Sequence, residues 1–162
     1  MRRISSFALL VSILAAMPAI SQTVPFGGAK SDLSAAVEVA ADDMSVNQST
    51  GEAELSGNVV IAQGEMRLSA DRVLVKYDAQ DKSRISSLDA TGNVTLVQGE
   101  DAAEAQKGVY EVANGLVTLT GDVLVTQGEN VMSGETIVVN LKDGTAKASG
   151  RVRTILQQGA TQ

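Results

Sequence analysis

Apolar and polar residues alternate with a period of two over most of the chain after residue 36. Around Gly57 the intervening residues are mostly polar, and the alternate, apolar set is Ala53, Leu55, Gly57, Val59 and Ile61. Successive side chains of a β-strand point to opposite faces, so this alternation predicts strands that bury one face. After residue 21, the stretch nearest to an amphipathic helix is 31–41, which we expect to form a short lead-in or a first strand. The pattern predicts an all-β protein.

The alternating segments are copies of one repeat. Each copy has a Gly-Asn-Val or Gly-Asp-Val triplet followed by Gln-Gly-Glu. The full copies are Gly57-Asn58-Val59 with Gln63-Gly64-Glu65, Gly92-Asn93-Val94 with Gln98-Gly99-Glu100, and Gly121-Asp122-Val123 with Gln127-Gly128-Glu129. A degenerate fourth copy begins at Gly150, so the first glycines of the copies are spaced by 35, 29 and 29 residues. A fixed period of this size predicts a stack of similar supersecondary units.

Turn signals separate the strands within each copy. Asn114-Gly115 and Asp143-Gly144 are strong two-residue hairpin signals, and a longer turn at 78–83 accounts for the 35-residue interval. The first glycine of each copy shares the parity of the apolar residues, where glycine most often marks a bulge or a bend. A row of such corners bends a sheet along one line. Each unit is therefore expected to be a strand, a bend and a second strand.

A second motif follows each of these glycines by 14 residues. It places a small residue before a polar one, at Ala70-Asp71, Ala105-Gln106 and Gly134-Glu135, with an earlier half-copy at Ala41-Asp42. Acid–base catalysis needs two carboxylates at one point, whereas repeat-equivalent acids fall in single file. We expect the motif acids and Glu65, Glu100 and Glu129 to cap turns and keep edges soluble. Calcium binding at stacked acidic turns is the alternative, although the dense glycine pattern of calcium solenoids is missing.

The first 21 residues have the order of a cleavable secretory signal. Arg2 and Arg3 form a basic head, residues 7–17 are apolar, and Ala19-Ile20-Ser21 is the small-residue pattern before the cut. A helix that spans a bilayer needs about 20 residues, so an uncleaved anchor is the less favoured alternative. We expect a signal at 1–21, a lead-in at 22–35, one β-domain at 36–158 and a tail at 159–162.

Composition narrows the range of functions. Removal of residues 1–21 leaves 11 basic against 19 acidic residues, and a chain this acidic is a poor binder of nucleic acid. Cysteine and histidine are absent, which argues against a zinc site, a thiol nucleophile and a Ser-His-Asp triad. Phe26, Tyr77 and Tyr110 are the only aromatic residues after the signal, so stacking platforms for sugars or bases are scarce. We expect no catalysis, no metal and no cofactor.

Several copies of the repeat in one register make the chain similar to a known family. The elements at Gly57, Gln63 and Ala70, repeated behind a signal sequence, resemble the LptA/OstA family of periplasmic lipopolysaccharide-transport proteins. The likeness covers residues 36–156 and implies an open, twisted β-jellyroll in the periplasm, built from repeats of bent antiparallel strands. It also implies that the interior binds the acyl chains of lipid A. The fourth copy departs from the pattern, because it lacks the asparagine after Gly150 and the Gln-Gly pair.

The resemblance implies partners and a role in transport. The partners are lipopolysaccharide itself, an inner-membrane LptC-type protein and the amino-terminal domain of an outer-membrane LptD-type protein. The expected function is a bridge or chaperone that shelters lipid A acyl chains in transit from the inner to the outer membrane. Three alternatives stay open: an LptC-like component of the same pathway, a structural β-solenoid with a dry core, and a hydrolase that uses Asp or Glu.

The inward parity defines the expected lipid-binding slot. Small side chains fill a folded-over sheet poorly, which leaves a lengthwise slot. Each methylene that leaves water stabilises a bound acyl chain by about 0.8 kcal/mol. The residues expected to line the slot are Leu55, Val59, Ile61, Val73, Val75, Leu96, Tyr110, Leu119, Val123, Val125, Ile137 and Val139.

The two ends of the stack are expected to differ in charge. The leading end carries Asp32, Glu38, Asp42 and Asp43, whereas the trailing end carries Arg151 and Arg153. Opposite charges at opposite ends favour head-to-tail contact, and open strand edges template pairing with another chain. We expect head-to-tail self-association in which residues 31–46 of one molecule pair with residues 145–158 of the next.

Overall fold

The computed structural model describes residues 22–28 and 31–156, and these residues fold into a single antiparallel sheet without any helix. The expected signal (1–21) and tail (159–162) lie outside the described residues. The strands are β1 (Gln22–Pro25), β2 (Glu38–Ala40), β3 (Asp43–Asn47), β4 (Glu52–Gln63), β5 (Met66–Tyr77), β6 (Ile85–Gln98), β7 (Asp101–Glu111), β8 (Leu116–Gln127), β9 (Asn130–Asn140), β10 (Thr145–Ser149) and β11 (Arg153–Ile155). The expected all-β jellyroll is confirmed. Within the described ranges, no helix has the length and apolarity to cross a membrane.

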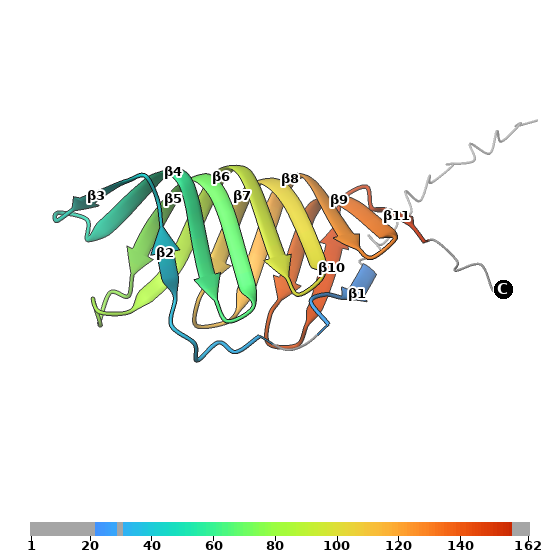
Figure 1. The fold of residues 1–162 in the computed structure, drawn as a ribbon, viewed down its shortest axis with the longest axis horizontal. Coiled ribbons are helices and arrows are strands. Elements are labelled where there is room, and N and C mark those ends of the chain that lie inside the picture. Colours follow the sequence, from blue (N-terminus) through green and yellow to red (C-terminus); the bar gives the residue numbers. More distant parts are fainter. Residues whose placement is uncertain (1–21, 29–30, 157–162) are drawn as a thin grey trace, which may run out of the picture.

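Consecutive strands are neighbours through most of the sheet. The order is β1-β10-β9-β8-β7-β6-β5-β4-β2, with β3 also paired to β4 and β11 also paired to β9 (Figure 1). The register of β4 to β9 shifts once near the middle of every strand pair, for example between Ser56 and Val59. Each long strand therefore bends at its middle, and the sheet folds over on itself. We call the two resulting halves the first leaf and the second leaf.

The two leaves have different flanking strands. The first leaf consists of 52–56, 72–77, 85–91, 107–111, 116–120, 136–140 and 145–149, with β3 at one edge and β1 at the other. The second leaf consists of 59–63, 66–70, 94–98, 101–105, 123–127 and 130–134, with β2 and β11 at its edges. Side chains of both leaves meet in one apolar cluster.

The corners lie where the repeat glycines predict them. Gly57 has φ 76° and the following Asn58 has φ 45°, a left-handed pair that turns the strand sharply. The second motif stabilises these corners, because its polar side chain bonds to the residue that follows the glycine of an adjacent corner. The pairs are Asp42–Asn58 (2.8 Å), Asp71–Asn93 (2.8 Å), Gln106–Asp122 (3.0 Å) and Glu135–Arg151 (2.6 Å). The expectation that these acids cap turns thus takes the specific form of corner contacts.

Opposite the corners, each leaf ends in a row of turns, which we call its lip. The first lip includes the turns at 78–84, 112–115 and 141–144, and the second lip includes those at 64–65, 99–100 and 128–129. β1 pairs with β10 at one end of the sheet, whereas β2 pairs with β4 at the other end. The N-terminal segment therefore has to travel the length of the sandwich, and Figure 1 shows it running along the side where the turns lie.

Candidate functional site

The apolar interior is the most distinctive feature of the fold. All twelve residues expected to line a slot lie inside it, with exposed fractions between 0 and 4 %. They come from both leaves and from every long strand between β4 and β9, so the interior is continuous along the stack. Their burial matches the predicted parity, whereas their contact with lipid stays a prediction.

Other buried side chains extend this interior beyond the twelve. Met66, Leu68 and Leu88 share the inward parity and could have been found by extending the same alternation. Phe26 is different, because it precedes the repeats and no periodicity marks it, yet only 1 % of it is exposed. It is brought to the core by β1, which places the N-terminal segment beside strands that come last in the sequence.

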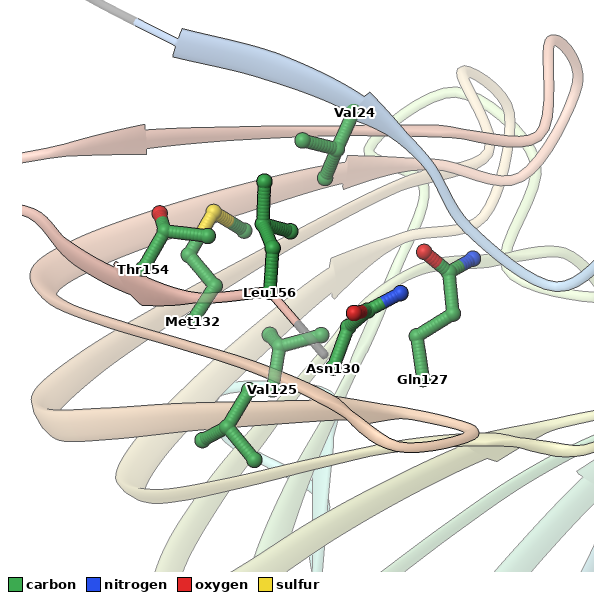
Figure 2. A pocket seen from close by; sticks show the side chains of 8 residues that line it. Val24, Val125, Gln127, Asn130, Met132, Thr154 and Leu156 are labelled. Carbon is green, nitrogen blue, oxygen red and sulfur yellow. The ribbon is translucent and has the colours of Figure 1, made fainter. Parts of the chain in front are cut away.

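The interior is closed to solvent in this conformation. At its C-terminal end a small apolar pocket of about 50 Å³ remains between β1 and β11 (Figure 2). Val24 and Leu156 flank this pocket, and Val125 and Met132 line it from the core side. Leu156 is 70 % exposed, so an apolar side chain stands in solvent at the end of the interior. An acyl chain can occupy the interior only after part of the structure has moved.

Polar groups lie inside the core on the side of the second lip. The buried ones among the described residues are Gln63, Gln98 and Asp101. Tyr110 reaches across from the first leaf, and its hydroxyl donates a hydrogen bond to Gln63 Oε1. Burial raises the pKa of the Tyr110 phenol to about 12, because the charged phenolate would lose its hydration. The phenol therefore stays protonated and remains a donor at neutral pH.

Residues 26–28 and 31–37, which we call the strap, lie between the two lips. The strap contacts the first lip through its backbone: Phe26 N–H donates to Gly144 O (2.8 Å) and Ser31 N–H donates to Leu141 O (3.1 Å). Farther along, Leu33 packs directly over Gly115 of the same lip. Leu33 and Val37 are half-buried and pack against the core. The neighbouring residues 32, 34 and 36 are exposed, so the side chains of this segment alternate between core and solvent.

The second lip holds the same segment with the glutamines of the repeat. Gln63 Nε2 donates to the carbonyls of Leu33 (3.0 Å) and Ala35 (2.9 Å). Gln98 packs against Gly27, and Gln127 Nε2 donates to the carbonyl of Pro25 (3.2 Å). The glutamine of each full copy therefore contacts the N-terminal segment at a different point. The recurrence of Gln at an inward position was the sequence signal for this role, but the sequence did not show what the side chains would bind.

Most of the described carboxylates make structural hydrogen bonds or lie at exposed turns, and they do not form a pair suited to acid–base catalysis. Asp101 is the buried one, and its Oδ2 accepts hydrogen bonds from Gly27 N–H (2.6 Å) and Gln127 Nε2 (2.8 Å). The repeat acids Glu65, Glu100 and Glu129 are exposed at turns, as expected. Within the part of the chain that the structure describes, no group of three His, Cys, Asp or Glu side chains could hold a metal ion.

These features define the class of the protein: an open β-jellyroll of stacked repeats with one continuous apolar interior and strand edges at both ends. The chain belongs to the family described as LptA/(LptD N-terminal domain) LPS transport protein, whose sequence model matches residues 38–145. The expected family is therefore confirmed.

Relatives and a solved structure agree with this assignment. The lipopolysaccharide export system protein LptA of Haemophilus influenzae is 27% identical over 137 residues, which cover 78% of this chain and 80% of the relative. The protein of the same name from Escherichia coli K12 is 23% identical over 158 residues, covering 91% and 85%. The crystal structure of LptH, the LptA homologous periplasmic component of the lipopolysaccharide transport device of Pseudomonas aeruginosa, superimposes with a TM-score of 0.71. The match has 23% identity and covers 79% of this chain and 99% of that one, which shows the shared fold.

Proposed function

We propose that this protein binds lipopolysaccharide in the periplasm and shelters its lipid A acyl chains in transit from the inner to the outer membrane. The observation that carries the proposal is the continuous apolar interior, which runs from β4 to β10 through both leaves. Acyl chains that replace water contacts by contacts with this interior gain about 0.8 kcal/mol for each buried methylene. The twelve predicted slot residues, from Leu55 to Val139, are the proposed contacts.

The protein acts by burial and does not drive transport. It shelters the cargo, and direction has to come from an energy source elsewhere in the machinery. We assign no catalytic residue, because the carboxylates with identified partners serve corners, turns, ion pairs between neighbouring strands and the contact between Asp101 and Gly27. The LptA-named relatives support the assignment to lipopolysaccharide export. Export through a cleaved signal, with a mature chain that begins at Gln22, accounts for a periplasmic location, and the intact mass of the periplasmic protein tests it.

The partners proposed are an LptC-type inner-membrane protein, the amino-terminal domain of an LptD-type outer-membrane protein, and further copies of this chain. The structure refines how such contacts would form. β10 is paired on both sides, by β1 and by β9, so residues 145–149 are not the free edge that the sequence suggested. The free edges at that end belong to β1 in the first leaf and β11 in the second. At the other end they belong to β3 in the first leaf and β2 in the second.

Head-to-tail stacking would therefore continue each leaf separately. β3 of one molecule would add to β1 of the next, and β2 would add to β11. Val39, Met44 and Val46 are exposed apolar side chains at the leading end, and Ile155 and Leu156 are exposed at the trailing end. Stacking covers these side chains and extends the apolar interior from one molecule to the next.

Photocrosslinking to purified lipopolysaccharide tests the lipid-binding proposal. A photoreactive residue at Ile61 or Val125, both buried in the core, should form an adduct with lipopolysaccharide. The matched control places the photoreactive residue at Leu124, which is 39 % exposed on the outer face of β8, and this variant should form no adduct. Equal labelling at Val125 and Leu124 would show that the interior does not hold the lipid, in agreement with a dry structural module.

A further inference from the structure

The interior needs a way to open, and two of its sides, the corners and the C-terminal end, offer poor ones. At the corners the two leaves are joined by continuous chain in every long strand, so parting them there breaks the ladders of β4 to β9. At the C-terminal end the pocket beside Val24 and Leu156 measures only about 50 Å³. A further side is the seam between the lips, where the strap lies.

The strap makes far fewer backbone hydrogen bonds to the rest of the fold than the long strands β4 to β9 make to their neighbours. None of the described residues 26–28 and 31–37 belongs to a strand, and their backbone bonds to the rest of the fold are single contacts with turns. Its two anchors are short, since β1 has four residues and β2 has three. Segments with few ladder bonds and partial burial open at lower free energy than core strands.

Polar contacts dominate the closure on the second lip. Gln63, Gln127 and Asp101 bind the backbone of the N-terminal segment, and water can replace such bonds when the segment leaves. Gln98 lies under Gly27 with both polar atoms of its amide buried and without a hydrogen-bond partner in the described structure. A buried unpaired amide costs free energy, and opening the seam would hydrate it. In the closed state, therefore, the amide of Gln98 lacks the hydrogen bonds that water would give it after opening.

An open pocket of about 320 Å³ is bordered by the C-terminal part of the strap and by the first lip. Its apolar walls are Leu33 and Val37 of the strap with Ile85 and Val112 on the first-leaf side, and Ser83 and Arg84 add polar groups at its edge. Gln63 also lines the pocket, and its Oε1 accepts a hydrogen bond from the Tyr110 hydroxyl inside the core. Gln63 thus borders this pocket on one side and contacts Tyr110 of the apolar interior on the other. Its volume falls within the usual range for small-molecule sites, about 300–1,000 Å³.

We propose that residues 31–37 of the strap close a lateral opening of the interior, and that an acyl chain enters and leaves sideways when this segment lifts out of the seam between the two lips. The inference rests on the proposed function, because it names the route by which that interior is filled. Leu33 and Val37 occupy the seam in the closed state, and the acyl chain takes their place against Ile85 and Val112. Lateral opening lets a branched amphiphile load without threading its chains through either end of the stack.

A disulfide across the seam provides the direct test. A Cβ placed on Gly64 would lie 3.9 Å from Asp32 Cβ, a separation that suits a disulfide, and the chain has no native cysteine. In the double variant Asp32→Cys/Gly64→Cys, oxidation fixes the strap to the second lip and reduction frees it. The reduced form carries the same substitutions, including the cost of a cysteine at φ +58°, and is therefore the matched control. A second control bridges Val109→Cys and Thr118→Cys, which face each other on β7 and β8 away from the seam.

The readout is the rate at which fluorescently labelled lipopolysaccharide associates with each form. Oxidation of the seam pair should slow association by about tenfold or more, and reduction should restore the wild-type rate, whereas oxidation of the β7–β8 pair should change little. The variant Leu33→Ala, which removes apolar contact from the strap, should associate faster than wild type. Equal rates for the oxidised and reduced seam pair would overturn the lateral opening and leave lipid binding intact. Failure of wild type and of every variant to bind lipopolysaccharide would overturn the proposed function itself.

Discussion

The phenol of Tyr110, on the first leaf, donates a hydrogen bond across the core to the side-chain oxygen of Gln63, on the second leaf. The amide nitrogen of the same Gln63 donates to the carbonyls of Leu33 and Ala35 on the strap. One glutamine therefore ties together both leaves and the segment that closes the seam. Both polar atoms of the Gln63 amide are hydrogen-bonded. Removing the Tyr110 hydroxyl should therefore lower the stability of the closed state.

Replacing Tyr110 by Phe should destabilise the protein by about 1–3 kcal/mol, because Gln63 Oε1 would be left buried without a donor. Urea denaturation followed by circular dichroism measures the change. Tyr77→Phe, at a half-buried position on β5, is the matched loss of a hydroxyl and should cost much less. Equal losses in the two variants would mean that the contact with Gln63 contributes no net stability.

The pKa of Tyr110 predicts a loss of stability in alkaline solution. The phenol has a folded-state pKa of about 12 against an ordinary value of 10.0, so the fold favours the protonated form. This contribution is fully present below pH 10 and is lost as the pH rises toward 12, by about 2–3 kcal/mol in total. Ultraviolet titration of Tyr77→Phe, in which Tyr110 is the remaining tyrosine, should give a midpoint near 12. A midpoint near 10 in the folded protein would contradict the burial of the phenol.

Placing a charge inside the core should abolish folding or lipid binding. Ile61 is fully buried, and an unpaired carboxylate at that position costs on the order of several kcal/mol. Thr120 lies half-buried on the opposite parity, directly across from Lys107 on β7, so Asp is tolerated there. Thermal melting and lipopolysaccharide binding of Ile61→Asp and Thr120→Asp compare the two faces. Similar behaviour of both variants would mean that the assignment of inner and outer faces is wrong.

The corners should be sensitive to a single methyl group. Gly57 has φ 76°, and a Cβ there would lie 2.5 Å from Asp42 Oδ2, so Gly57→Ala combines backbone strain with a collision. Gly128 has φ 57° and open space around it, so Gly128→Ala has the strain alone, about 1–2 kcal/mol. Gly57→Ala should therefore lose distinctly more unfolding free energy in urea than Gly128→Ala. If the two losses are the same, the corner contact with Asp42 is not rigid.

Head-to-tail stacking predicts a specific crosslink between the second leaves of adjacent molecules. Val39 on β2 and Ile155 on β11 are exposed at opposite ends, and Cys at both positions should form a disulfide-linked ladder on a denaturing gel. Either single variant should give dimers at most, and high salt should weaken the ladder because acidic and basic ends attract each other. A crosslinked species no larger than a dimer in the double variant would indicate a closed two-fold pair.

Periodicity determined the part of the fold that repeats. Alternation placed the slot residues on the inner face, and the glycines at 57, 92, 121 and 150 located the corners, because both depend on local backbone geometry. The partners of the second motif were missed: sequence spacing suggested turn caps, but Asp71 bonds to Asn93, which is 22 residues away. Such contacts depend on how the sheet folds over, which no local pattern specifies.

The non-repeating segment was the least predictable part. Residues 22–35 looked like a lead-in, yet β1 adds to the far edge of the sheet and Phe26 enters the core. Nothing in the spacing of Val24, Phe26 or Leu33 indicates which lip they contact, because those partners belong to turns distributed from residue 64 to residue 144. The sequence therefore predicted where the interior lies but not how it is closed.

The chain of corner contacts has a consequence for the size of such proteins. Each contact joins one copy of the repeat to the next, and the chemistry differs between copies, from Asp–Asn to Gln–Asp to Glu–Arg. Because any donor–acceptor pair of this length satisfies the geometry, a copy can be inserted or deleted without redesigning its neighbours. Each copy adds two strands, or about 10 Å of sheet at the usual spacing between strands. The distance that one molecule spans can therefore change during evolution in steps of one repeat.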